Sequence, residues 1–380
     1  MLLPYAIIFF IILFILLGKG GDVKAYLTTD DSKFDHYCLL LFFLLFYVLY
    51  AFRSQDVGND TNTYLELYNS VAENAYSAML GYFGRYEPGY IYFNKFLSDI
   101  WSNPQFLFII SGIIVFSAFY KLIAKYSEFI LLSIFLFFTL RIFDDSMNVT
   151  RSIIAMALLI YSYSFLRKQR GIPFVLLVFA AALFHKSAII FLLTWFLVKL
   201  KINRALIVYW VIGLFAAAVL SPQIISFLFN HNILPDYYLD SEYFDDGKIA
   251  PLLMLIISLL ISIFGLLSKV YQKPSNGDAE GEVVFDNKNM LIFQMFATLL
   301  LVFNIHFAGL FRVAGFFQLF SIVLLPNSLK NFKNKQTYFI LLIIIIAIFA
   351  LYYTIIITYR PLWNKVYPYS FFDFFDAAIK

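Results

Sequence analysis

Five ionisable side chains stand inside or beside apolar segments, where a site buried among helices could use them. His185 in AAALFHKSAII and Arg312 in NIHFAGLFRVAGFFQLF interrupt apolar runs, and Arg151 opens another. Glu87 and Asp60 lie in a polar stretch between two runs. Arginine offers a fork of donors that suits phosphate, whereas histidine and carboxylates can take a proton from a hydroxyl. These residue types indicate a site that binds phosphate and moves a proton.

The composition places these residues in a membrane protein. The 380 residues are 62% hydrophobic and 14% charged, and apolar runs recur along the whole chain. We therefore predict an all-α polytopic protein with about 10–14 transmembrane or partly inserted helices in one integral membrane domain, residues 1–380. The N-terminal run is expected to be a retained span, and the single Cys38 allows no intrachain disulfide. The net charge of +4 is spread over many loops, so no nucleic-acid partner is expected.

Along the chain, loops rich in lysine alternate with loops that carry few lysines. By the positive-inside rule, the lysine-rich loops, including 268–289, are expected in the cytoplasm. Loops 53–104 and 221–250 then lie on the extracytoplasmic side. Six arginines also fall on that side against the topogenic bias, which a lipid phosphate or pyrophosphate would explain: Arg53, Arg85, Arg141, Arg151, Arg312 and Arg360.

His185 is expected at the turn of a short helical hairpin. Basic clusters at 167–170 and 199–204 flank it, and the arms 172–184 and 187–198 are each only ~20 Å long as helix. Small residues at −4 and +3 share its face, which indicates close packing against protein or a cavity. The alternative is a histidine bonded to a neighbouring helix, with Lys186 extending its ammonium to the membrane surface.

The remaining candidates carry similar alternatives. Arg312 also has small residues at −4 and +3, and Arg151 is either functional or a helix-end anchor at the interface. Asp60 and Glu87 are expected at helix N-termini, where simple capping competes with a role as a base or sugar-hydroxyl acceptor. The apolar residues of 90–101 predict an interfacial helix.

Two pairs of acidic residues are expected to have no catalytic or metal-binding role. Asp144 and Asp145 are expected to be solvated or to pair with Arg141. Asp240 and Glu242 resemble a carboxylate pair for a divalent ion, but a solvated acidic loop is the favoured interpretation.

A series of short motifs runs in order along the chain: FR-x3-VGND-x3-Y, EPGY, M-x3-R-x3-A, FHKSAII, FR-x2-GFF and YPYSF. This series resembles the EpsG family of bacterial polysaccharide-synthesis proteins, related to Wzy-type repeat-unit polymerases. Thr61 and Ser152 depart from its pattern, which often has an aromatic residue and a glutamine there. The resemblance implies a GT-C-like fold with its site facing the extracytoplasmic side of the bacterial inner membrane. The site residues it implies are Arg53, Asp60, Tyr64, Glu87, Arg151, His185 and Arg312.

The resemblance also implies an activity. A growing glycan would pass from polyprenyl pyrophosphate onto a lipid-linked repeat unit, for capsule, exopolysaccharide or O-antigen. Arg151 and Arg312 would bind pyrophosphate with help from Arg53 or Arg141. His185 is the first choice as base, with Glu87 its rival and Asp60 a third candidate. No cofactor is expected, a divalent metal stays open, and a flippase and a chain-length regulator are the partners to consider.

Two other functions fit part of the sequence. A flippase for lipid-linked oligosaccharides would also place cations in a central cavity, and its loss would trap repeat units inside the cell. A membrane acyltransferase would use an intramembrane histidine such as His185, and its loss would leave polymer of normal length without acyl groups. Loss of a polymerase would instead leave single repeat units on lipid outside.

Overall fold

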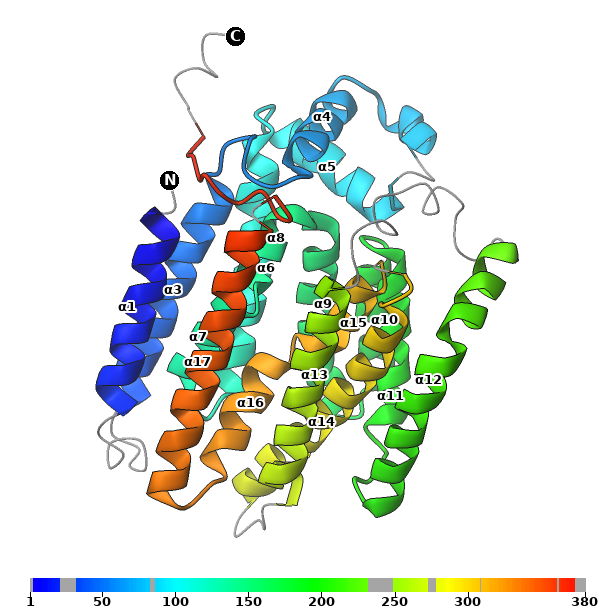
Figure 1. The fold of residues 1–380 in the computed structure, drawn as a ribbon. Coiled ribbons are helices and arrows are strands. Elements are labelled where there is room, and N and C mark those ends of the chain that lie inside the picture. The colour runs from blue at the N-terminus through cyan, green and yellow to red at the C-terminus, as the bar shows by residue number, and fades with distance from the viewer. Residues whose placement is uncertain are drawn as a thin grey trace. The chain divides into compact units, whose positions relative to one another are not determined.

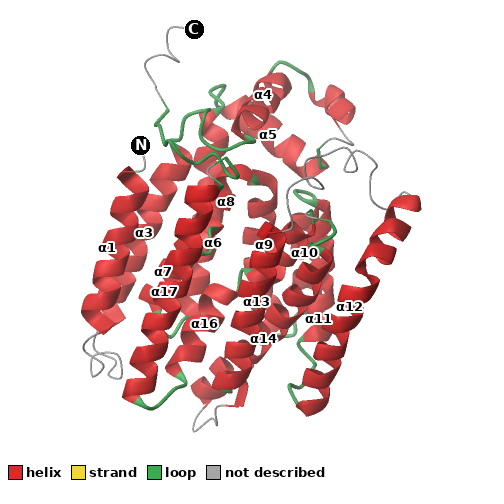
Figure 2. Cartoon of the chain, viewed as in Figure 1, coloured by secondary structure: helices red, strands yellow, loops and turns green. Residues whose placement is uncertain are grey.

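A computed structural model describes residues 3–20, 32–82, 86–231, 249–272, 278–307, 309–360 and 362–372. These residues form α-helices and short 3₁₀ helices joined by loops, and no strand occurs among them (Figure 2). The prediction of an all-α polytopic membrane protein is confirmed. The chain folds into two compact units, residues 1–189 with 332–380 and residues 190–331.

Ten helical segments within the described residues are apolar enough to enter a membrane. Five helices are long enough to cross, a bent pair makes a sixth span, and four shorter apolar helices remain. The bent pair, at Leu310–Gln318 and Ser321–Lys330, turns by 43°. Helices also extend into ranges expected to be loops, because α12 continues to Asn230 and α14 begins at Asp278. The acidic residues of the 221–250 loop lie outside the described residues.

The first unit is a helical bundle with a layer of shorter helices at one end (Figure 1). Its helices pack through aromatic rings, as in the Phe46–Phe137 and Phe46–Phe143 contacts at 5.4 and 4.7 Å. The bundle elements are α1 (Leu3–Gly20), α3 (Ser32–Ala51), α6 (Gln105–Tyr126), α7 (Ile130–Thr139), α8 (Ile142–Asn148), α9 (Thr150–Arg167), α10 (Gly171–Ala182) and α17 (Lys335–Tyr359). The end layer comprises α4 (Thr61–Ala72), η2 (Tyr76–Tyr82) and α5 (Pro88–Ile100).

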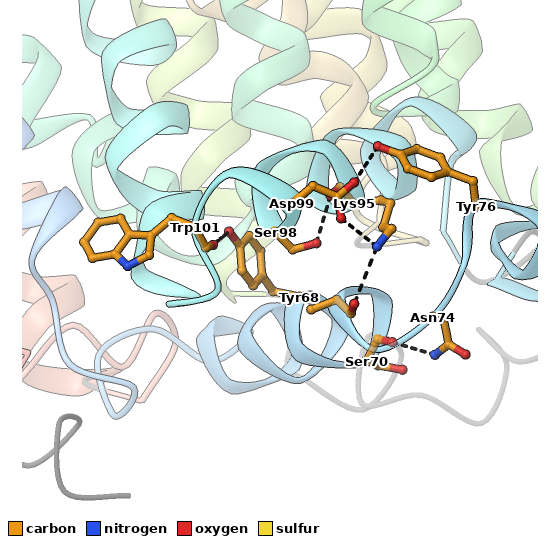
Figure 3. A network of polar contacts seen from close by, with 9 residues as sticks. Tyr68, Ser70, Asn74, Tyr76, Lys95, Ser98, Asp99 and Trp101 are labelled. Carbon is orange, nitrogen blue, oxygen red and sulfur yellow. Dashed lines mark hydrogen bonds and ion pairs between the residues drawn. The ribbon is translucent and has the colours of Figure 1, made fainter.

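Polar contacts join the elements of the end layer (Figure 3). Lys95 pairs with Asp99 at 2.7 Å, and the hydroxyl of Tyr76 donates to the same carboxylate at 2.8 Å. The hydroxyl of Tyr68 on α4 donates to the carbonyl of Trp101, directly after α5, at 2.6 Å. Because the Tyr76 and Tyr68 contacts each join two elements, α4, η2 and α5 are held as one layer.

The second unit is also helical and contains a polar seam. Ser258 and Ser262 both bond the hydroxyl of Thr298, at 2.8 and 2.9 Å, and Gln294 donates to Ser258 Oγ at 2.8 Å. Such contacts satisfy polar groups between apolar helices. The elements are α11 (Thr194–Leu197), α12 (Arg204–Asn230), α13 (Ile249–Ser268), η5 (Val270–Gln272), α14 (Asp278–Phe303), α15 (Leu310–Gln318) and α16 (Ser321–Lys330). The 3₁₀ helix η3 (Lys186–Leu193) leads from the first unit into the second.

Candidate active site

Glu87 lies at the N-terminus of α5, as predicted, but its side chain does not cap that helix. Its backbone is extended, with φ −72° and ψ 143°, and Pro88 follows at the first helical position. The carboxylate makes no capping hydrogen bond and is nearly buried. It contacts residues of two other elements instead, so the capping interpretation of Glu87 is wrong.

Arg151 brings a guanidinium to this carboxylate from the first turn of α9. Its Nη1 donates to Glu87 Oε2 at 2.5 Å, and its guanidinium carbon lies 5.3 Å from the ring centre of Tyr86. The Arg151 side chain remains 24% exposed. Among the described residues its Nε has no hydrogen-bond partner. A buried donor without a partner costs free energy and is expected where a ligand completes the set.

His185 reaches the same carboxylate from the turn between α10 and η3, where the sequence predicted a turn. Its backbone amide donates to the carbonyl of Ala181 at 3.0 Å, which continues the last turn of α10. Its Nδ1 lies 3.5 Å from Glu87 Oε1, and the backbone amide of Lys186 donates to that oxygen at 3.2 Å. Glu87 therefore joins α5, α9 and the α10–η3 turn in what we call the Glu87 cluster: Glu87, Arg151 and His185.

The environment of Glu87 keeps it ionised. Burial by itself would raise the pKa of Glu87, but the neighbouring His185 imidazole and the Arg151 guanidinium lower it to about 2. A carboxylate with this pKa holds no proton at neutral pH and is a weak base. It suits a positioning role, because a carboxylate on Nδ1 orients the imidazole and places the lone pair on Nε2.

Tyr64 of α4 lies beside the cluster. Its ring centre is 5.7 Å from that of Tyr90, and both hydroxyls are close enough to Arg151 to interact with it electrostatically. The structure thus brings together four of the predicted site residues: Tyr64, Glu87, Arg151 and His185. Their side chains come from α4, α5, α9 and the turn between α10 and η3.

Arg53 is fully buried and occupied by internal contacts. Its Nη1 donates to the carbonyl of Tyr50 at 2.7 Å and its Nε to Thr61 Oγ1 at 3.3 Å. Its guanidinium carbon lies 3.7 Å from the ring centre of Phe108. These contacts tie α3 to the start of α4 and leave Arg53 outside the Glu87 cluster. Asp60 stands at the N-terminus of α4, where its side chain makes no capping hydrogen bond.

Arg141 is buried at the corner between α7 and α8. Its backbone is left-handed, with φ 66°, and its Nε lies 3.8 Å from Asp144 Oδ2. The ring of Trp363 covers it at 4.6 Å, and Asn364 donates to Asp145 Oδ1 at 2.8 Å. The predicted pairing of Arg141 with an aspartate is confirmed. These contacts do not include the Glu87 cluster.

Arg312 lies on α15 in the second unit, and its predicted role in phosphate binding stays a prediction. Among the described residues, no group of three or more His, Cys, Asp or Glu side chains could hold a metal ion.

Two contributors to the site were missed by the sequence analysis. Gly89 allows α5 to approach α10, because a Cβ there would lie 2.6 Å from the Cβ of Leu183. The backbone amide of Lys186 donates to Glu87 Oε1, and no side-chain pattern in the sequence predicts this contact. The signal for Gly89 was present, since a glycine directly after Glu87-Pro88 marks a close backbone approach.

The fold and the site together define a multi-pass membrane protein with a partly buried carboxylate–arginine–histidine cluster at one end of a helical bundle. The sequence model of the EpsG family matches residues 36–371. The chain therefore belongs to the EpsG family, whose members are membrane proteins of polysaccharide biosynthesis. No curated protein and no solved structure matches it significantly.

Proposed function

We propose that the protein is a polysaccharide polymerase with a GT-C-like glycosyltransferase site on the extracytoplasmic face of the bacterial inner membrane. It would transfer a growing glycan from polyprenyl pyrophosphate onto a lipid-linked repeat unit. The observation that carries the proposal is the Glu87 carboxylate shared by Arg151 and His185. Family membership and the distribution of lysines support it.

The cluster can perform the two tasks that this transfer needs. The acceptor hydroxyl gives its proton to His185 Nε2 while its oxygen forms a bond to the anomeric carbon. The bond from that carbon to the pyrophosphate breaks, and the leaving group takes the electron pair. Arg151 neutralises the charge that develops on the pyrophosphate, and Glu87 holds both partners in position. Arg312 is a second proposed phosphate ligand.

Purified protein in vesicles with a defined polyprenyl-pyrophosphate repeat unit provides the test. The expected product is a ladder of longer lipid-linked glycans, and a parallel reaction with a chelator decides whether a divalent metal is used. R151K keeps the positive charge but loses the paired N–H donors of the guanidinium. Removing one hydrogen-bond donor that stabilises developing charge lowers rates by about 10²–10³-fold, and a loss of this size is expected for R151K. R204K on the exposed start of α12 is the matched control and should retain the ladder. A normal ladder from R151K, or none from the wild type, would contradict the proposal.

A further inference from the structure

The layer formed by α4 and α5 presents opposite chemistry on its two outer faces. The inner face of α4, with Tyr64, Leu67 and Tyr68, is buried. The outer face of α4 is polar and exposed through Asn62, Glu66 and Asn69. The exposed residues of α5 are largely apolar, with Tyr92, Phe96 and Ile100 beside Asp99, whose carboxylate pairs with Lys95. A layer with one polar and one apolar outer face is suited to lie between water and hydrocarbon.

The first turns of α5 contact the C-terminal end of α10 through the apolar face of α5. The backbone amide of Tyr90 donates to the carbonyl of Leu183, and the rings of Phe93 and Phe184 lie 5.6 Å apart. Gly89, Phe93, Phe96 and Ile100 follow a 4–3–4 spacing, which places them along one face of the helix. This face therefore touches α10 in its first turns and then continues as exposed phenylalanine and isoleucine, 58% and 59% exposed.

A second exposed apolar row runs along α10 to the same point. Its members are Ile172, Leu176, Phe179 and Leu183, again at 4–3–4 spacing, and all are exposed. α10 is one of the short apolar helices that can enter a membrane. On such a helix an exposed row of large apolar side chains is what contact with lipid requires.

The two rows meet beside the Glu87 cluster. Glu87 is two residues before Gly89, and His185 is two residues after Leu183, so the contact between Gly89 and Leu183 adjoins both side chains. The long apolar helix α6 begins at Gln105, only a few residues after α5 ends at Ile100. This connection ties α5 to the level where the spans leave the bilayer.

We propose that the edge formed by α5 and α10 is embedded in the bilayer leaflet on the site's side, and that a lipid-borne substrate reaches the Glu87 cluster sideways along it. The proposed occupant of this surface is lipid, because the surface is continuous with the exposed apolar row of α10. The substrate step rests on the proposed function, whereas the lipid contact does not.

Lipid contact can be measured without any activity assay. In a C38S background, single cysteines at Phe96 and Leu183 are labelled with an environment-sensitive fluorophore, and Glu66→Cys on the outer face of α4 is the matched control. In vesicles of lipids brominated on the acyl chains, the labels at 96 and 183 should lose most of their fluorescence. The label at 66 should keep it and be quenched by aqueous iodide instead.

Two results would overturn the lipid contact. Iodide could quench the labels at 96 and 183 as well as the label at 66, which would mean water. Alternatively, neither quencher could reach them, which would mean that a protein partner covers the edge. Where F96C does not fold, Ile100→Cys reports on the same row.

The sideways path is tested with polyprenyl pyrophosphate that carries a diazirine within its chain. Crosslinks to α5 and α10 are expected. They should also form in R151K, because the polyprenyl chain would contact the exposed apolar rows of these helices rather than the Glu87 cluster. Crosslinks confined to other helices would overturn the path. Since this readout needs no glycan transfer, it can fail while the ladder assay succeeds, and the reverse.

Discussion

Glu87 is the residue on which the proposed site depends. It holds Arg151 at 2.5 Å and His185 at 3.5 Å, although the three residues lie on separate elements. The low pKa of Glu87, about 2, suits its carboxylate to positioning Arg151 and His185, and His185 stays the proposed proton acceptor. The sequence leaves open whether Glu87 or His185 takes the proton from the acceptor. The charged surroundings of Glu87 make its carboxylate the weaker candidate.

We expect H185A to lower the rate of polymer formation by about 10²–10⁴-fold, because a general base contributes that much. E87Q keeps the shape of the side chain but loses the ionic contacts with Arg151 and His185. It should lower the rate of transfer more than it lowers the affinity for the acceptor. Rates at saturating and limiting acceptor separate the two effects. Equal rates in wild type and H185A would exclude His185 as base.

The Glu87 contacts should also make stability depend on pH. The pKa of Glu87 is lower in the folded protein, about 2, than its ordinary 4.5, so its contribution is fully present above about pH 4.5. The contribution is lost as the pH falls from there toward about 2. The melting temperature of wild type should exceed that of E87Q at pH 6, and the difference should shrink below pH 4.5. A difference that grows on acidification would contradict this.

Gly89 provides a test of geometry alone. A Cβ at this position would lie 2.6 Å from the Cβ and 2.8 Å from the carbonyl oxygen of Leu183, so G89A must push α5 away from α10. A displacement of about 1 Å can lower a rate by about 100-fold. G81A is the control, because nothing lies within 4 Å of a Cβ there. The ladder assay should lose product in G89A and keep it in G81A.

At the scale of elements, the C-terminal segment 362–372 secures the loop that leads into α4. Ser54 donates its amide to Ser370, Gly58 donates to Lys365, both at 2.9 Å, and Asn59 Nδ2 donates to Trp363 at 2.7 Å. Gly58 has a φ of +93°, a conformation that other residues rarely adopt. This segment therefore holds the loop with Asp60 and, through α4, Tyr64.

Removal of residues 362–380 should destabilise this end of the protein, because the loop from 52 to 60 loses these partners. We expect a lower melting temperature and loss of polymer. Removal of 373–380 alone leaves every contact named above in place and is the control. Thermal unfolding in detergent measures the difference, and equal melting temperatures for the two deletions would show that the segment does not stabilise the loop.

At the scale of the whole molecule, the orientation in the membrane is the prediction that matters most. Lysine-rich loops are expected in the cytoplasm, which places α4 and α5 outside. In a C38S background, N69C on α4 should react with an impermeant thiol reagent in intact cells. K201C should react only after the cells are permeabilised. The opposite pattern would place the Glu87 cluster on the cytoplasmic face.

The class of protein was determined by the sequence itself, since apolar runs in a chain with few charges can only be stable in a membrane. Helix starts at Asp60 and Glu87 and the turn at His185 were also predictable, because proline, acidic residues and interrupted apolar runs act locally. The family followed from short motifs in a fixed order.

Only the tertiary structure decided which of these residues meet. Arg53 and Arg151 are the same residue type at similar membrane-edge positions, yet one is enclosed by Tyr50 and Phe108 and the other binds Glu87. Glu87 and His185 are far apart in sequence and are joined by the approach of Gly89 to Leu183. Packing between distant segments sets burial and partners, and these determine whether a charged side chain supports the fold or is available for chemistry.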